Sequence, residues 1–404
     1  MVVGCALFGN TGLFAFLSLE GPFQRDDAPL DYSAMAIEPR PDDPQRNGYT
    51  ALRELAATQD IDLGDSFYAL QDAAREDRDI PAMQAILDQH AWVFPKVQNA
   101  FDKPVFYFDQ PITPETLIPE VGFFRNYVLL AGVRARLAMI AKDYDAALQH
   151  LLTLEAQLQR FSQSGGGLIN LLTTIACHGI LQSEWSTFLA EAQLDPARFA
   201  AAADELVLYQ TLTASFQSAM RHEFHFSVYC IQLVQQDPWE ILGAVRSLSG
   251  DLSEEISKLE KFLYKSAVAF AYKPTETTNL VFRVYQEVNL QAKRPAAKRN
   301  YPIWEQVQED YFDLEEHNFF ARNAVGRILL RILVPAVKSV QEHVDRARAA
   351  SAATQVLFAL RAYHGAHGVL PDTLDQLVPD YLKAIPADPF DGQPMRYSRQ
   401  QGIV

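Results

Sequence analysis

The stretch ARLAMIAKDYDAALQHLLTLEAQL, residues 135–158, decides the fold class of this chain. On both sides of Lys142-Asp143, apolar residues recur at the spacing of the buried face of an α-helix. Lys142-Asp143 is a short polar break, and Tyr144 and Ala147 suit the close approach of two helices. The stretch therefore predicts two helices joined by a tight turn, which is a helical hairpin.

The same stretch resembles one tetratricopeptide unit, and residues 141–147 carry the resemblance. A solenoid of such units needs about three copies to bury a continuous core. Only one good copy is present, so the stretch indicates a single tetratricopeptide-like hairpin and is not evidence for a peptide-binding groove.

Helical periodicity also fills most of the remaining chain, with breaks at Asp195-Pro196 and Lys273-Pro274. Asp79, followed by Pro81, is a typical helix start. The predicted fold class is mainly α, with stacked antiparallel helical hairpins forming a domain over residues 48–331. Helices are expected within residues 49–101, 120–163, 168–192, 196–235, 252–272 and 275–291.

Length and composition describe an ordinary globular protein with an acidic surface. The 404 residues suggest roughly two or three domains. Hydrophobic residues make up 49% and charged residues 21%, which disfavours long disordered stretches. The net charge of −15 argues against nucleic acid, because binding phosphate requires clustered Lys and Arg.

The three cysteines, Cys5, Cys177 and Cys230, lie far apart and match no metal-binding spacing. Cys177 and Cys230 both lie in apolar helical runs. Buried free thiols are the favoured interpretation, and a bridge between Cys177 and Cys230 stays open as the alternative.

The N-terminal region suggests a membrane protein. Residues 2–19 carry no charge and are followed by a spacer rich in Pro and Asp, residues 20–47. We expect residues 2–19 to be a membrane anchor, and the alternative is an apolar helix packed on the core. This layout predicts a bacterial inner-membrane location with the globular body on the periplasmic side.

The strongest catalytic candidate is the cluster His222, Glu223 and His225. A zinc protease helix needs HExxH, which places two imidazoles four residues apart on one face. Here the histidines are three residues apart and no third ligand is evident, so the favoured interpretation is polar residues along a helix. Gly165-Gly166-Gly167 lacks the Lys-Ser/Thr of a phosphate-binding loop. No catalytic residue or cofactor is therefore predicted.

Near the C-terminus the sequence pattern changes from long helical spacing to turn-forming residues. Residues 332–364 form a long helical pattern, after which Pro371 begins a short helix with Leu374 and Leu377 on its apolar face. Asp391-Gly392 is a typical tight hairpin turn. Residues 332–404 are therefore predicted to be a long helix carrying a small α+β cap.

This C-terminal order resembles the major pseudopilins of type II secretion. A pseudopilin begins with its own membrane helix and has no long helical domain before it, so filament assembly is not implied. In that family a further strand and a calcium-binding loop follow the tyrosine that corresponds to Tyr397, and no residue here is assigned to calcium. The matching residues are Ala362, Tyr363, Gly368, Leu370, Pro371, Leu374, Leu377, Tyr381, Pro386, Asp388, Pro389, Gly392, Pro394 and Tyr397.

Together these features predict a non-enzymatic structural or protein-interaction protein of the bacterial cell envelope. Its partner would be another protein, together with the membrane through its N-terminal segment. Two alternatives stay open: a metal-dependent helical enzyme using His222, Glu223 and His225, and a soluble cytoplasmic helical adaptor.

Overall fold

The computed structural model describes residues 25–37, 43–64, 79–236, 272–312, 322–334 and 337–400. This part of the chain is mainly helical and contains no β-strand, which confirms the predicted α class. Its α-helices are α2 (Gly48–Thr58), α4 (Ile80–Gln89), α5 (Val93–Phe101), α6 (Pro119–Ile140), α7 (Tyr144–Ser162), α8 (Gly167–Glu191), α9 (Pro196–Glu205), α10 (Leu208–Gln236), α13 (Pro274–Gln291), α14 (Pro302–Phe312), α15 (Ala324–Leu333) and α16 (Val337–His367).

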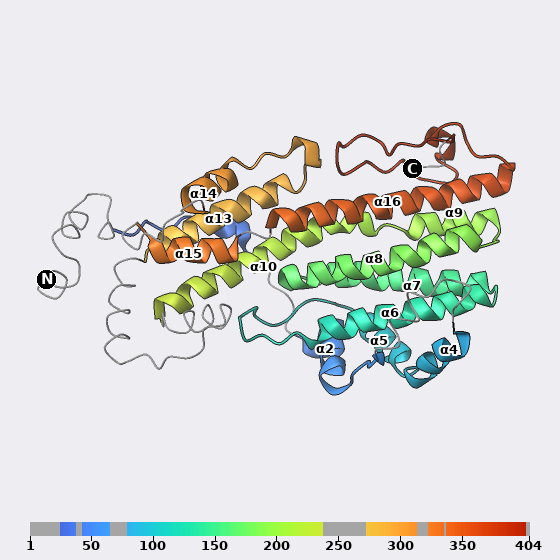
Figure 1. The fold of residues 1–404 in the computed structure, drawn as a ribbon, viewed down its shortest axis with the longest axis horizontal. Coiled ribbons are helices and arrows are strands. Elements are labelled where there is room, and N and C mark those ends of the chain that lie inside the picture. Colours follow the sequence, from blue (N-terminus) through green and yellow to red (C-terminus); the bar gives the residue numbers. More distant parts are fainter. Residues whose placement is uncertain are drawn as a thin grey trace, which may run out of the picture.

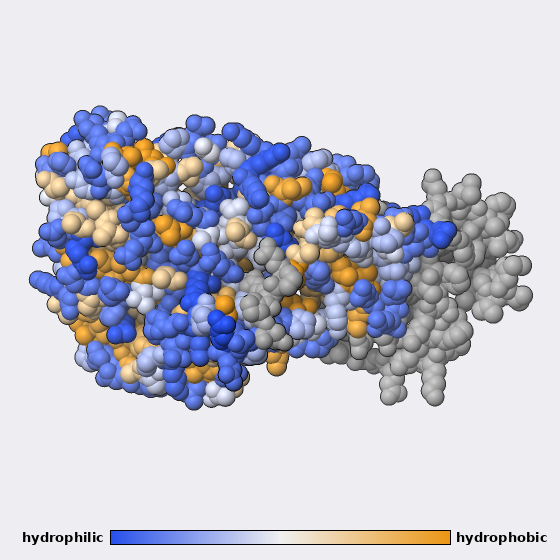
Figure 2. All heavy atoms as spheres, turned by 180° about the vertical axis from the view of Figure 1, so that it is seen from behind, coloured by the Kyte–Doolittle hydropathy of each residue, from blue (hydrophilic) through white to orange (hydrophobic). Residues whose placement is uncertain are grey.

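The long helices lie side by side along the long axis of the molecule (Figure 1). Helix α6 packs on α7 and α8, and α16 packs along α8, α9 and α10. Helices α2, α4 and α5 lie along one side of the bundle, next to α6. Helices α13, α14 and α15 gather at the end that is on the left in Figure 1, where α13 and α15 contact α10. Hydrophilic residues cover most of the face seen in Figure 2, and hydrophobic residues form separate groups on it.

Aspartates begin several helices by accepting a hydrogen bond from a first-turn amide. Asp79 accepts from Ala82 N, and Asp143 accepts from Ala146 N. Helix α7 therefore begins directly after Lys142-Asp143, where the hairpin turn is predicted. The helix predicted at 196–235 is divided into α9 and α10, which separate at Leu206 without a Gly or Pro to signal the break.

Two ionic contacts lie inside this helical body. Arg136 on α6 pairs with Glu184 on α8, and both side chains are almost completely buried. Arg299 pairs with Asp345 on α16 in the same way. Because a buried charge is costly without its partner, each pair fixes how the two segments face each other.

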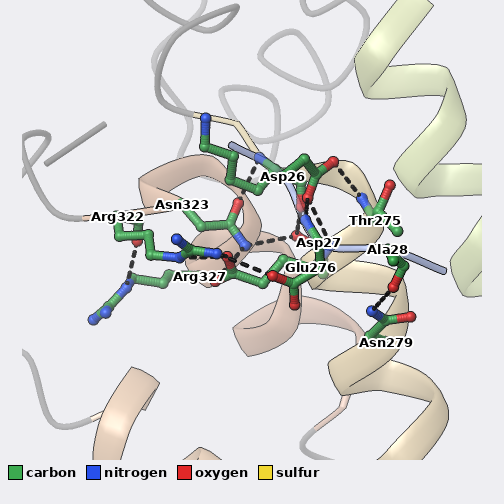
Figure 3. Close-up of polar contacts among 11 residues, drawn as sticks. Asp26, Asp27, Ala28, Thr275, Glu276, Asn279, Arg322, Asn323 and Arg327 are labelled. Atoms are coloured by element: carbon green, nitrogen blue, oxygen red, sulfur yellow. Dashed lines mark hydrogen bonds and ion pairs between the residues drawn. The ribbon is translucent and has the colours of Figure 1, made fainter. Parts of the chain in front are cut away.

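Residues 25–37, predicted to belong to an extended spacer, instead pack against the helical body. The carboxylate of Asp26 accepts hydrogen bonds from the backbone amides of Thr275 and Glu276, both at 3.0 Å, at the start of α13 (Figure 3). Asn279 donates to the carbonyl of Ala28 at 2.9 Å. Arg322 pairs with both Asp27 and Glu276, so this strap (residues 25–37) is held by charge and by helix capping.

The C-terminal region forms turns on α16 but no sheet within the described residues. A short 3-10 helix (Leu374–Leu377) is followed by an antiparallel bridge between Ala387 and Pro394. Pro386, Pro389 and Pro394 lack the N–H groups that would extend such a bridge into a ladder. The expected α+β character of the cap is therefore not confirmed.

The cap rests on the basic loop that precedes α14. The amides of Ala296 and Ala297 donate to the carbonyls of Pro389 at 3.0 Å and Phe390 at 2.8 Å. A Cβ on Gly392, which has a φ of 77°, would lie 2.6 Å from Pro295 Cγ. Two segments about a hundred residues apart in sequence are thus fitted closely together.

The predictions of a transmembrane helix and of an inner-membrane location are corrected by the structure. Among the described helices, none is both long enough and apolar enough to cross a bilayer. Helix α16, for example, carries charged residues such as Lys338, Glu342 and Arg346 along its length. The expected anchor, residues 2–19, lies outside the described residues.

Candidate binding pocket

A pocket of about 700 Å³ lies between α10 and the loop that follows α5. The loop contributes a mixture of aromatic, apolar and polar residues, and α10 contributes four ring-bearing side chains. The lining residues are Ile37, Pro44, Tyr107, Phe108, Asp109, Gln110, Pro111, Ile112, Thr113, His222, His225, Phe226 and Tyr229.

Helical spacing explains why α10 forms one wall of the pocket. His222, His225, Phe226 and Tyr229 recur at three- and four-residue intervals, which places them on one side of the helix. His222 is 8% exposed, whereas Tyr229 is 38% exposed. The wall therefore extends from the packed interior at His222 to the surface at Tyr229.

The opposite wall is held in place by the buried side chain of Asn47. Its Nδ2 donates to the carbonyl of Tyr107 at 2.8 Å, and its Oδ1 accepts from the amide of Tyr107 at 3.0 Å. The amide of Phe108 donates to Ser164 O at 2.9 Å. Asn47 therefore bonds both backbone polar groups of Tyr107, and Ser164 bonds the amide of Phe108. These hydrogen bonds hold the loop in one position, so it presents a fixed surface to the pocket.

Aromatic packing supports the same wall from behind. The ring of Tyr49 meets Phe106 and Phe108 edge-on, each at a centroid distance of 5.5 Å. Phe108 in turn meets the ring of His222 edge-on at 6.5 Å. These contacts connect the loop to α2 and to α10 through one aromatic cluster.

Both pocket histidines hydrogen-bond to backbone carbonyls. His222 Nδ1 lies 2.9 Å from Ser218 O, and His225 Nε2 lies 3.0 Å from Met35 O in the strap. A carbonyl oxygen only accepts, so each of these ring nitrogens is the donor. The bonds fix the orientation of both rings, and that of His225 joins α10 to the strap.

Glu223, the third member of the predicted cluster, makes its contact at the start of α8. Its Oε1 accepts a hydrogen bond from Leu168 N at 2.8 Å, and a Cβ on Gly167 would lie 2.7 Å from the same oxygen. Burial raises the pKa of Glu223, and the Leu168 amide partly offsets this effect. The carboxylate of Glu223 therefore lies against the glycine triplet, Gly165-Gly166-Gly167. The left-handed φ angles of these glycines allow the carboxylate to approach the backbone closely.

The described residues contain no group of three or more His, Cys, Asp or Glu side chains arranged to hold a metal ion. Cys177 and Cys230 are both buried, free thiols, so they form no bridge to each other. Burial raises the pKa of Cys177 to about 12. Cys5 lies outside the described residues.

One carboxylate lines the pocket, and it is paired. Asp109 accepts hydrogen bonds from Thr50 and Arg53 on α2. Partial burial alone would raise the pKa of Asp109, but the contacts with Arg53 and Thr50 outweigh burial and lower it. Asp109 is therefore a carboxylate anion at neutral pH, and Arg53 is not itself among the lining residues.

Comparison with protein-family models, curated proteins and solved structures finds no match for this chain. The geometry of the pocket and the chemistry of its walls therefore carry the functional argument. The sequence singled out His222 and His225 of this site, but not Phe226, Tyr229 or the loop. The aromatic run 105–108 is the signal in the sequence that could have pointed to the loop.

Proposed function

We propose that this chain is a non-enzymatic protein-interaction protein whose pocket receives a side chain of a partner protein. The observation that carries the proposal is the composition of the pocket walls. They combine aromatic and aliphatic surface with polar groups that bond mainly to the protein itself. Preformed concave sites of this kind are typical of binding sites, where apolar walls supply affinity and a few polar groups orient the ligand.

The engagement of the polar groups supports binding over catalysis. His222 and His225 donate to carbonyls, Glu223 accepts from the α8 amide, and Asp109 pairs with Arg53. A metal site needs three or more such ligands directed at one ion, and the described residues contain no such group. The metal-dependent enzyme is therefore the weaker alternative.

We also propose that the helices form stacked antiparallel hairpins and that residues 332–404 are a pseudopilin-like cap on them. The hairpin arrangement is supported by the short turn between α6 and α7 and by the packing of α7 on both α6 and α8. The cap is supported by the matching residues and by the turn in which Gly392 N donates to Asp388 O at 2.8 Å. In this proposal the cap is a structural element and the pocket is the binding site.

Peptide binding tests the proposed function. A labelled Gly/Ser peptide carrying one central residue X is titrated into the purified protein, with X set to Ala, Leu, Phe, Tyr, Trp, Lys or Arg. We expect binding that depends on X and that weakens in Tyr229→Ala. The control is Phe390→Ala, because Phe390 is a similarly exposed aromatic residue in the cap.

Equal affinity for all peptides, including the Ala peptide, would contradict the proposal. So would equal loss of binding in Tyr229→Ala and Phe390→Ala, because the effect would then not report the pocket. Metal analysis of the purified protein tests the alternative, a metal-dependent enzyme. Stoichiometric zinc or iron that is lost in His225→Ala would overturn a purely binding role.

A further inference from the structure

We propose that the side chain received by the pocket is cationic, that is, an arginine or lysine of the partner protein. This inference rests on the proposed function and specifies its ligand chemistry. Three independent features of the pocket support it: the rings of its walls, the orientation of His225, and the distribution of formal charge around it.

The first feature is the set of aromatic residues that line both walls of the pocket. Tyr107 and Phe108 lie on the loop side, and Phe226 and Tyr229 lie on the α10 side. The face of an aromatic ring carries negative potential, so rings gathered around a cavity attract a cation there. The attraction increases when the cation is desolvated, and Tyr107 and Phe108 are buried. The methylene groups of Arg or Lys would pack on Ile37, Pro111 and Ile112.

The second feature is the orientation of His225. Because its Nε2 donates to Met35 O, Nδ1 is the ring nitrogen left to accept a hydrogen bond. A ring in this state offers a hydrogen-bond acceptor and a π face, both of which suit an N–H-bearing cation. The Met35 carbonyl in the strap therefore determines which ring nitrogen of His225 is available as an acceptor.

The third feature is the charge around the cavity. Asp109 lines the pocket, whereas its partner Arg53 does not. The whole chain has a net charge of −15, which also favours the approach of a basic partner.

Neutral isosteres separate charge from size. The Gly/Ser peptide with X as Arg is compared with X as citrulline, and X as Lys with X as norleucine. We expect the cationic member of each pair to bind about tenfold more tightly, at low ionic strength. Equal affinity within both pairs, together with weak binding of the Ala peptide, would overturn the cationic ligand and leave the proposed function standing. If no peptide binds, the proposed function fails as well.

Charge variants at the pocket give effects of opposite sign. Arg53→Gln leaves the Asp109 carboxylate without its cation, so we expect tighter binding of the Arg peptide. Asp109→Asn leaves Arg53 unpaired, so we expect weaker binding. The citrulline peptide should respond little to either variant. Changes of the same sign in both variants, with helicity by circular dichroism unchanged, would contradict the inference.

The aromatic contribution is tested at Tyr229, because an exposed side chain contributes little to the packed core. Tyr229→Leu keeps apolar surface but removes the ring, so we expect the preference for Arg over citrulline to decrease severalfold. Phe390→Leu in the cap is the matched control and should retain the full preference. An unchanged preference in Tyr229→Leu would mean that this ring does not contact the bound side chain.

Discussion

A carboxylate buried between α7 and α8 makes the stability of this protein depend on pH. Glu155 on α7 is 2% exposed, and its Oε1 has no hydrogen-bond partner. Trp185 Nε1 on α8 donates to Oε2 at 3.5 Å. Burial raises the pKa of Glu155 from 4.5 to about 7, and Trp185 and the Leu208 amide only partly offset this rise.

The sign and size of the effect follow from proton linkage. The folded protein binds the proton on Glu155 more tightly than the unfolded chain, so the contribution of Glu155 to stability is highest below about pH 4.5 and is lost as the pH rises through about 7. A rise of about 2.5 in pKa corresponds to about 3 kcal/mol once both states are ionised. Between about pH 5 and about pH 8, the expected loss is roughly 2.5 kcal/mol.

Glu155→Gln should remove this loss, because an amide does not ionise. We expect the free energy of unfolding of Glu155→Gln, relative to that of the unmodified protein, to be about 2.5 kcal/mol larger at about pH 8 than at about pH 5. Urea titration followed by tryptophan fluorescence measures this quantity at each pH. Comparing two pH values cancels any fixed cost of burying the amide.

The matched control is Glu54→Gln on α2, where the carboxylate is exposed to solvent in the folded protein. Glu54→Gln should change stability by a similar small amount at both pH values. A stability difference for Glu155→Gln that is the same at both pH values would refute the claim that Glu155 is buried without an adequate partner.

Three further predictions concern other buried or linking groups. Arg136→Met leaves the Glu184 carboxylate buried without its partner and should cost about 3–5 kcal/mol in urea unfolding, whereas replacing both residues by apolar ones should cost less. Burial lowers the pKa of His178 to about 4, so stability should fall as the pH drops from 6.5 towards 4, and His178→Gln should reduce this fall. Asp26→Ala removes the cap on α13, so it should cost about 1 kcal/mol and accelerate chymotryptic cleavage at Tyr32 in the strap.

The sequence predicted what local patterns encode. Periodicity and turn residues gave the helical class, the start of α4 after Asp79 and the turn at Lys142-Asp143. These features depend on residues within a few positions of each other, where capping and helical spacing act. The division between α9 and α10 at Leu206 was missed because neither Gly nor Pro marks it.

The pocket could be predicted only in part, because it depends on contacts between distant residues. His222 and His225 were recognised as neighbours on one helix. The loop at 107–113, which forms the opposite wall, is held in place by Asn47, 60 residues before Tyr107. The role of Glu223 at the start of α8 depends on a contact across 55 residues. No local signal in a single sequence specifies such pairings, since they follow from how whole helices pack.

The strap illustrates the same limit in a segment of spacer-like composition. Pro29 and the nearby aspartates disfavour local structure, and this pattern was interpreted as part of a spacer. The amides at the start of α13 supply the partner for Asp26, and they lie about 250 residues away in the sequence. A charged residue in such a segment is therefore able to cap a distant helix, and composition alone does not distinguish the two cases.

Hydrogen–deuterium exchange with the Arg peptide tests the central claim most directly, because it reports where the ligand binds. The account predicts slower exchange in residues 107–113 and 222–229 when the peptide is present, with little change in the cap at residues 374–397. Slower exchange confined to the cap or to α13–α15, or no change at a saturating peptide concentration, would contradict the assignment of this pocket as the binding site.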